Sequence, residues 1–122
     1  MPRNRQSAKK AGSSFERLVA DYLRDALGDD RIDRRPRHGA KDRGDIGGVG
    51  HMGGRLVFEC KNTTRIELSR WLAEAEIERG NDDALAGIVV HKRRGKTAAQ
   101  EQYVTMRLGD LAALLTGDRD HA

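Results

Sequence analysis

The sequence has few of the residues on which several protein classes depend. A single cysteine, Cys60, excludes an internal disulfide and any zinc site built from several cysteines. No apolar run approaches the roughly 18 residues of a membrane span. The segment from Met1 to Gly12 also lacks the apolar stretch of a signal peptide. We therefore expect a cytoplasmic protein without a membrane partner.

Aromatic residues are equally scarce, with two Phe, two Tyr and one Trp among 122 residues. This length suits one domain, which buries roughly two-thirds of the surface of its unfolded chain and needs no disulfide or structural metal. We predict a basic N-terminal tail over residues 1–12, a single domain over 13–116 and a C-terminal tail over 117–122.

The charge of the chain is sorted into patches. Its 23 Lys and Arg exceed its 19 Asp and Glu, giving a net charge of +4. Fourteen of the basic residues, with only two acidic ones, lie in residues 1–12, 31–43 and 92–96, so the remainder has nine basic residues against seventeen acidic ones. Such patches are either solvated charge or a surface for a polyanion, and three clusters together favour DNA or RNA.

Apolar periodicity and turn residues predict an alternation of helices and strands. A capping-box pattern at Ser13 and Glu16 begins a first helix that ends at Gly28, and the same pattern at Thr64 and Glu67 begins a second, which ends near Asn81. Strands are predicted over residues 31–37 at a sheet edge, then over 45–49, 55–61, 84–91 and 102–108, before a short helix that Asp110 caps. This αβββαβ order, extended by a strand and a helix, indicates an α/β domain with a mixed central sheet flanked by helices.

The strand over residues 55–61 alternates in character. Leu56, Phe58 and Cys60 share one face, which we expect the second helix to cover, and the opposite face is charged. Cys60 is therefore predicted to be a small buried residue and not a nucleophile.

Two carboxylates on this hairpin are predicted to face each other. If the hairpin turns symmetrically about Met52, Asp45 lies opposite Glu59, and cross-strand neighbours are about 5 Å apart. Like charges at that distance require a proton or a cation between them, and oxygen ligands suit Mg²⁺ or Mn²⁺. Lys61 follows on the same face, roughly 6.5 Å further along, where it would orient a water or stabilise developing phosphate charge. Such a site would hydrolyse a phosphodiester.

These residues resemble the motif of the PD-(D/E)xK nuclease superfamily. The likeness covers Ser13 to Val90 and includes Glu16 on the first helix, Asp45 at the start of a strand and Glu59-Cys60-Lys61 on the next. Within the superfamily, the chain is most similar to the archaeal-type Holliday junction resolvases, which are homodimers of similar length. We expect this chain to act in a prokaryotic or phage-infected cell. The proline that names the motif is absent here, because Arg43 and Gly44 precede Asp45.

The resemblance implies a restriction-endonuclease-like fold and a Mg²⁺-dependent endodeoxyribonuclease that acts in DNA recombination and repair. By this likeness Asp45 and Glu59 bind the metal, with the backbone carbonyl of Cys60 as a further ligand. Lys61 acts on the nucleophilic water, and Glu16 completes the catalytic set. From the sequence alone, Glu16 is equally well explained as the partner of the Ser13 cap.

Contacts to the DNA are expected from the two basic clusters that flank the motif. These residues are Arg34, Arg35, Arg37, Lys41 and Arg43 before the site, and Lys92, Arg93, Arg94 and Lys96 after the central strand. The scarcity of aromatic residues favours duplex or branched DNA over single strands. Paired cuts across a junction imply a homodimer, for which Trp71 and the final helix are candidate contacts and equally candidate core.

No nucleotide cofactor is expected. Gly48, Gly50 and Gly53 match G-x-G-x-x-G but lead into a predicted strand, whereas dinucleotide binding needs a helix there. Gly95-Lys96-Thr97 lacks the earlier glycine of a phosphate-binding loop. Two other functions stay open beside the resolvase: a restriction-like or repair nuclease on linear or damaged DNA, and a non-catalytic DNA-binding module on the same fold.

Overall fold

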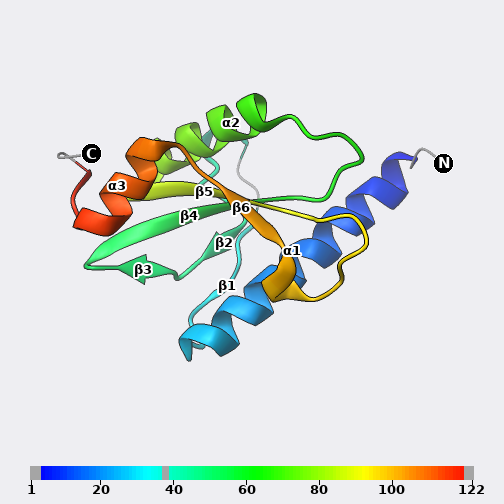
Figure 1. The fold of residues 1–122 in the computed structure, drawn as a ribbon, viewed down its shortest axis with the longest axis horizontal. Coiled ribbons are helices and arrows are strands. Elements are labelled where there is room, and N and C mark those ends of the chain that lie inside the picture. The colour runs from blue at the N-terminus through cyan, green and yellow to red at the C-terminus, as the bar shows by residue number, and fades with distance from the viewer. Residues whose placement is uncertain (1–3, 37–38, 120–122) are drawn as a thin grey trace.

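A computed structural model describes residues 4–36 and 39–119 as an α/β arrangement with a mixed open sheet (Figure 1). The described helices are α1 (Arg5–Leu27), α2 (Leu68–Asn81) and α3 (Leu108–Thr116), with short 3₁₀ turns η1 (Gly39–Lys41) and η2 (Ala99–Glu101). The strands are β1 (Asp33–Arg34), β2 (Ile46–Gly47), β3 (Gly50–His51), β4 (Gly54–Lys61), β5 (Ala86–His91) and β6 (Tyr103–Thr105). None of the helices in this part of the chain is long and apolar enough to cross a membrane.

The sheet has the order β1-β2-β4-β5-β6, and β3 extends the hairpin by pairing with β4. β4 and β5 run parallel, and every other described pair is antiparallel. The parallel pair requires a crossover, which α2 supplies. The predicted order of elements is confirmed, except that the first arm of the hairpin is divided into β2 and β3.

The predicted start of the first helix is wrong. α1 begins at Arg5, where the side chain of Asn4 accepts a hydrogen bond of 2.7 Å from the Ser7 amide. Residues 5–12, assigned to a basic tail, are therefore helical, and Ser13 lies inside the helix. The capping pattern at Ser13 was misleading because residues 5–12 contain no large apolar side chain and so show no apolar periodicity.

The other two helices also begin elsewhere than predicted. α2 starts at Leu68 after Glu67, four residues beyond Thr64, and α3 starts at Leu108, so Asp110 lies in its first turn instead of capping it. Glu67 and Arg107 occupy the cap positions without a side-chain hydrogen bond. Packing against the sheet therefore determines where these helices begin, and capping side chains do not.

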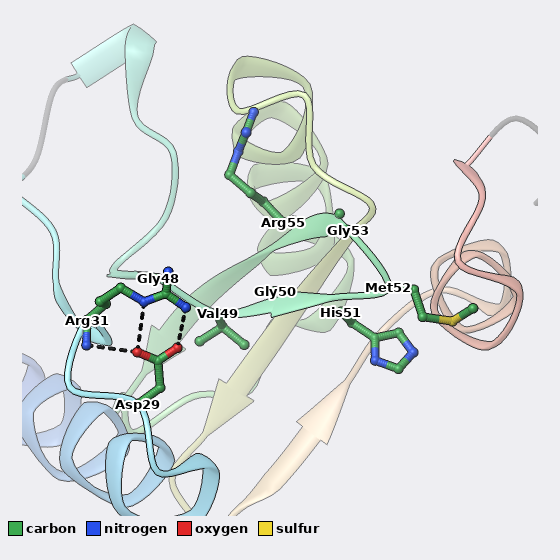
Figure 2. A pocket seen from close by; sticks show the side chains of 10 residues that line it. Asp29, Arg31, Gly48, Val49, Gly50, His51, Met52, Gly53 and Arg55 are labelled. Atoms are coloured by element: carbon green, nitrogen blue, oxygen red, sulfur yellow. Dashed lines mark hydrogen bonds and ion pairs between the residues drawn. The ribbon is translucent and has the colours of Figure 1, made fainter.

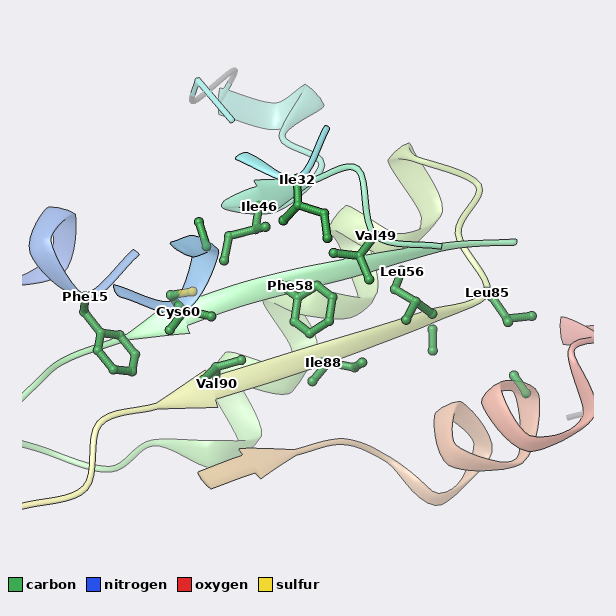
Figure 3. Packing of buried hydrophobic residues seen from close by; sticks show 14 residues of the cluster. Phe15, Ile32, Ile46, Val49, Leu56, Phe58, Cys60, Leu85, Ile88 and Val90 are labelled. Carbon is green, nitrogen blue, oxygen red and sulfur yellow. The ribbon is translucent and has the colours of Figure 1, made fainter. Parts of the chain in front are cut away.

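The helices cover both faces of the sheet, but not as predicted. Phe58, Ile88 and their neighbours on one face pack against Phe15 and Val19 of α1 and Ala113 of α3 (Figure 3). α2 covers the opposite face, where Trp71 and Ala75 pack against Val89. The second helix therefore lies over the face that bears the charged residues of β4, and α1 takes the place expected for it.

The hairpin has the predicted register, but its turn differs from the symmetric one predicted about Met52. Its tip is a two-residue turn that pairs His51 with Gly54, whereas Ile46 pairs with Phe58 further along. Val49 accepts from the Leu56 N–H in the register of the tip, so the extra residue of the first arm lies at Gly47 and Gly48, where it shifts the register by one residue, as a β-bulge does. Gly48 has φ +90°, and a Cβ there would lie 2.5 Å from the Arg31 carbonyl oxygen. Only glycine fits at this position.

Candidate active site

Asp45 is held in place by three hydrogen bonds. Its backbone N–H donates to the Phe58 carbonyl, and its own carbonyl accepts from the Arg35 N–H, both at 2.7 Å. Its carboxylate Oδ2 accepts from the Cys60 backbone N–H, also at 2.7 Å. The side chain is thus buried beside β4 in one defined orientation.

Gly44 explains why this segment can lie so close to β4. It has φ +95°, and a Cβ there would lie 2.9 Å from the Phe58 carbonyl oxygen. A side chain, including that of proline, has no room at this point of the chain. The absence of a proline before Asp45 therefore has a local steric reason.

Glu59 lies across from Asp45, as predicted. Ile46 pairs with Phe58, so Asp45 and Glu59, the next residue on each side, lie at neighbouring positions. The carboxyl groups of Asp45 and Glu59 form a hydrogen bond. Burial, then the hydrogen bond to Asp45 and the negative charge of that residue, raise the pKa of Glu59 to about 10. One carboxyl of the pair is therefore protonated at neutral pH when no cation is present.

Lys61 extends the site on the same face of β4. Its Nζ lies 3.7 Å from Glu59 Oε2 and donates a hydrogen bond of 2.7 Å to Glu74 Oε2 on α2. Burial acts to lower the pKa of Lys61, but the hydrogen bond to Glu74 and the surrounding carboxylates outweigh it, so the pKa is raised. Lys61 is a fixed cation in this site.

Two carboxylates of the site escaped prediction, because α2 covers this face of the sheet. Glu74 holds Lys61, and Glu78 is buried with its side chain hydrogen-bonded to Glu59. Burial raises the pKa of Glu78 to about 7, with the charges of Asp42 and Asp45 adding to the effect. A signal existed in the sequence: Glu78 follows Trp71 and Ala75 at helical spacing, on the stripe that faces the sheet.

These groups border a cleft of about 480 Å³ between η1, β4 and α2. Asp42, Glu59, Lys61, Glu74, Glu78 and Asn81 are among the residues that line it, whereas Asp45 is not. The Asn81 side chain donates to the carbonyls of Ala40 and Asp42, at 2.9 and 2.8 Å, and ties the η1 loop to the end of α2. The cleft is strongly acidic, with Lys61 as its cation.

Glu16 is buried in α1, and its Oε1 lies 3.8 Å from Nε of Arg34. Its explanation as the partner of a Ser13 cap is wrong, because the helix begins eight residues earlier. Its negative charge reaches Cys60, whose thiol pKa is raised mainly by burial and also by Asp45 and Glu16. Glu16 thus lies near β4, which carries Glu59, Cys60 and Lys61.

The donor set fits a hard divalent cation that keeps much of its water. In residues 4–36 and 39–119 no three Asp, Glu, His or Cys side chains surround a point closely enough to enclose a metal. Mg²⁺, however, is commonly held by one or two carboxylates and several waters. Asp45 and Glu59 provide two such carboxylates, and they share a proton when no cation is present.

The predicted DNA contacts that precede Asp45 in the sequence are of two kinds: some are engaged in contacts within the fold, and others are more exposed. Arg35 donates to the Arg43 carbonyl at 2.8 Å and lies 3.5 Å from the buried carboxylate of Asp82, so it serves the fold. Arg43 and Arg55 also approach Asp82, at 3.7 and 3.4 Å, but are more exposed. Lys41 is exposed on η1, Arg34 lies beside Glu16, and Arg37 falls outside the described residues.

The second predicted cluster follows β5, whose end pairs with Lys61. Lys92 donates to the carbonyls of Arg93 and Lys96, and Arg93 stacks 4.2 Å above the ring of Tyr103. These two shape the loop, whereas Arg94 and Lys96 are exposed. The basic beginning of α1 lies at the same end of β4, where Asn62 donates to the Ala11 carbonyl (Figure 1).

A larger hollow, of about 560 Å³, lies at the other end of the hairpin (Figure 2). Asp29 forms hydrogen bonds of 2.8 and 3.0 Å with the Arg31 guanidinium, and this partner lowers the Asp29 pKa to about 2. Gly48, Gly50 and Gly53 line the hollow within a hairpin instead of before a helix. Its only carboxylate is neutralised, so the acidic cleft is the better candidate for catalysis.

No protein-family model, curated protein or solved structure matches this chain.

Proposed function

We propose that this chain is a metal-dependent endodeoxyribonuclease of the PD-(D/E)xK type, and that its substrate is branched DNA such as a Holliday junction. The observation that carries the proposal is the pairing of the Asp45 and Glu59 carboxyls, with the Lys61 ammonium 3.7 Å from Glu59. A buried pair of carboxylates lowers the stability of the fold, and such pairs are concentrated at functional sites. Catalysis of phosphodiester hydrolysis is such a use.

Asp45 and Glu59 would hold Mg²⁺ or Mn²⁺, with the Cys60 carbonyl as a further ligand. The ion would supply Lewis acidity toward a phosphate oxygen. The chain contributes rigidity, because the Cys60 N–H orients Asp45 and the β-ladder orients Glu59. Ligands that are already oriented need little reorganisation when the substrate arrives.

Lys61 would orient the attacking water and stabilise the negative charge that develops on the phosphate. Its ammonium carries three donors, and one of them is given to Glu74 at 2.7 Å. The remaining donors are available for water and substrate. Glu16, near Cys60, would add negative charge to the metal side of the site.

The DNA backbone would be bound by cations on either side of the cleft. Lys41 and Arg43 flank one side, and Arg94 and Lys96 extend from the end of β5 near Lys61. Phosphate contacts of this kind suit duplex arms, because the chain has few aromatic platforms for unstacked bases.

The test is cleavage of a labelled four-way junction and a matched linear duplex, with Mg²⁺ or with EDTA. We expect symmetric, Mg²⁺-dependent nicks in the junction alone, lost in Lys61→Ala and retained in Arg17→Ala, which removes an exposed charge of α1. Cutting of both substrates would replace the resolvase by a broader nuclease. Tight DNA binding without cutting would refute catalysis and leave a DNA-binding module.

A second variant tests the assignment of Glu59. Glu59→Gln should abolish cleavage, because an amide is a poor ligand for Mg²⁺, and should preserve DNA binding, because Glu59 is already uncharged when no cation is present. Binding is measured by fluorescence anisotropy of the labelled junction in Ca²⁺ or EDTA. A variant that cuts at the normal rate would show that the site is assigned wrongly.

A further inference from the structure

Glu78 is a buried acid of α2 to which the proposed mechanism gives no role. Its side chain is hydrogen-bonded to Glu59, and the residue is only 5% exposed. Its carboxyl oxygen Oε1 is buried and has no hydrogen-bond partner within residues 4–36 and 39–119. Almost every buried acceptor in a folded protein has a donor, so an orphaned oxygen indicates a water or an ion that completes it.

The fold itself gives no reason for an acid at this position. Glu78 lies with Trp71 and Ala75 on the buried stripe of α2, where an apolar side chain is expected. It also lies in the last turn of the helix, where a negative charge is unfavourable. The helix packs closely one turn earlier, because a Cβ at Gly87 would lie 3.0 Å from the Ala75 carbonyl oxygen. Packing therefore holds Glu78 against the sheet although its charge destabilises the helix.

The other orphaned buried atoms of the described side chains have different surroundings. They are Trp71 Nε1 and Asp82 Oδ2. Asp82 Oδ2 lies 3.5 and 3.4 Å from arginine nitrogens of Arg35 and Arg55, which supply positive charge. Trp71 Nε1 is a donor and cannot bind a cation. Of the three residues, only Glu78 lines the acidic cleft.

The donor that suits Glu78 Oε1 is a water held by a cation on Glu59. Glu78 contacts Glu59 directly, and Glu59 is a ligand in the proposed site. A Mg²⁺ ion that is bound by one or two carboxylates keeps several waters, and each of them needs an acceptor. Groups that hydrogen-bond to a ligand or to such a water orient the site and raise its affinity for the metal.

We propose that Glu78 is a positioning residue of the metal site. One of its carboxyl oxygens orients Glu59, and Oε1 accepts a hydrogen bond from a water of the cation's hydration shell. This inference rests on the proposed function, because it requires a cation at Asp45 and Glu59. The role depends on the acceptor oxygen and not on the charge of Glu78, which separates it from a general effect of acidity in the cleft.

The experiment is Mn²⁺ binding to the full chain without DNA, followed by the electron paramagnetic resonance signal of unbound Mn²⁺. Glu78→Gln loses the charge but keeps an acceptor oxygen and a donor for Glu59, whereas Glu78→Met keeps the length and loses both. We expect Glu78→Met to weaken Mn²⁺ binding roughly 10- to 100-fold, and Glu78→Gln to stay within about threefold of the wild type.

The matched control is Glu74→Met, which removes a carboxylate of the same cleft that is engaged with Lys61. It should bind Mn²⁺ within about threefold of the wild type. Urea unfolding in EDTA gives a second readout. Glu78→Met should be at least as stable as the wild type there, because it replaces an unsatisfied buried acceptor by an apolar group of similar shape.

Three results would overturn the proposal. They are a Glu78→Met chain that binds Mn²⁺ like the wild type, a Glu78→Gln chain that is weakened as much as Glu78→Met, and a loss of binding in Glu78→Met that is accompanied by a loss of stability. If Glu59→Gln loses Mn²⁺ binding and Glu78→Met retains it, only this inference fails. A chain that shows the expected binding pattern but cuts no DNA refutes only the proposed nuclease, and a wild type that binds no Mn²⁺ refutes both.

Discussion

Replacing Glu59 by glutamine should stabilise the metal-free protein. Glu59 is buried, hydrogen-bonded to Asp45, and has a pKa raised to about 10 by burial and by that neighbour. The glutamine side chain would keep a similar shape and donate its amide to the Asp45 carboxylate, but it never carries a charge. The variant therefore removes the free-energy cost of keeping this carboxyl protonated, which the wild type bears at neutral pH.

The magnitude follows from proton linkage. Between the ordinary pKa of 4.5 and the raised value of about 10, the folded protein holds a proton that the unfolded chain has lost. The free energy of unfolding therefore falls as pH rises through this window, by up to about 1.4 kcal/mol per pH unit. At pH 7.5 the cost reaches about 4 kcal/mol as an upper bound, and we expect Glu59→Gln to regain about 2–4 kcal/mol of it.

The assay is urea unfolding in EDTA at pH 5 and pH 8, followed by the fluorescence of the buried Trp71. The gain should be large at pH 8 and small at pH 5. Glu101→Gln, at an exposed glutamate, is the control and should change stability by less than about 0.5 kcal/mol at either pH. A variant less stable than the wild type at pH 8, or a gain that is the same at both pH values, would refute the reasoning.

Three further predictions concern groups that support the site. Glu74→Gln should lower the cleavage rate about tenfold with little change in thermal midpoint, because it weakens the contact that holds the Lys61 ammonium in place; single-turnover kinetics measure this. Gly44→Ala should destabilise the protein by about 1–3 kcal/mol more than Gly53→Ala, because both have positive φ but only the first meets backbone; urea unfolding compares the two. Asp82→Asn should cost about 3 kcal/mol in the same assay, because it leaves three arginines without their shared buried carboxylate, and an unchanged midpoint would contradict this.

The elements with strong periodicity were predicted correctly. The alternation of β4 and the unbroken apolar run of β5 reflect burial on one or both faces, which is a local property of the sequence. The opposition of Asp45 and Glu59 also followed from counting residues across a turn. The bulge at Gly48 and the two-residue tip shift the register in opposite senses, so the count gave the right pair although the assumed turn was wrong.

The helix starts were predicted poorly, because a capping pattern is a weak signal beside tertiary packing. Ser13 and Thr64 both match a capping box, yet neither begins a helix. Asn4 caps α1 because its side chain reaches the Ser7 amide, and residues 5–12 continue the helix without an apolar face. Local pattern alone does not distinguish the first capping residue from a later one inside the helix.

The sequence by itself determined the α/β order of elements, the central strand and the placement of Asp45, Glu59 and Lys61 on one hairpin. These depend on spacing within a short stretch of chain. Only the tertiary structure decided that α2 covers the charged face and adds Glu74 and Glu78 to the cleft, and that Arg35 pairs with Asp82 across 47 positions of sequence. Contacts between distant segments depend on how helices pack on a twisted sheet, and no local pattern encodes that geometry.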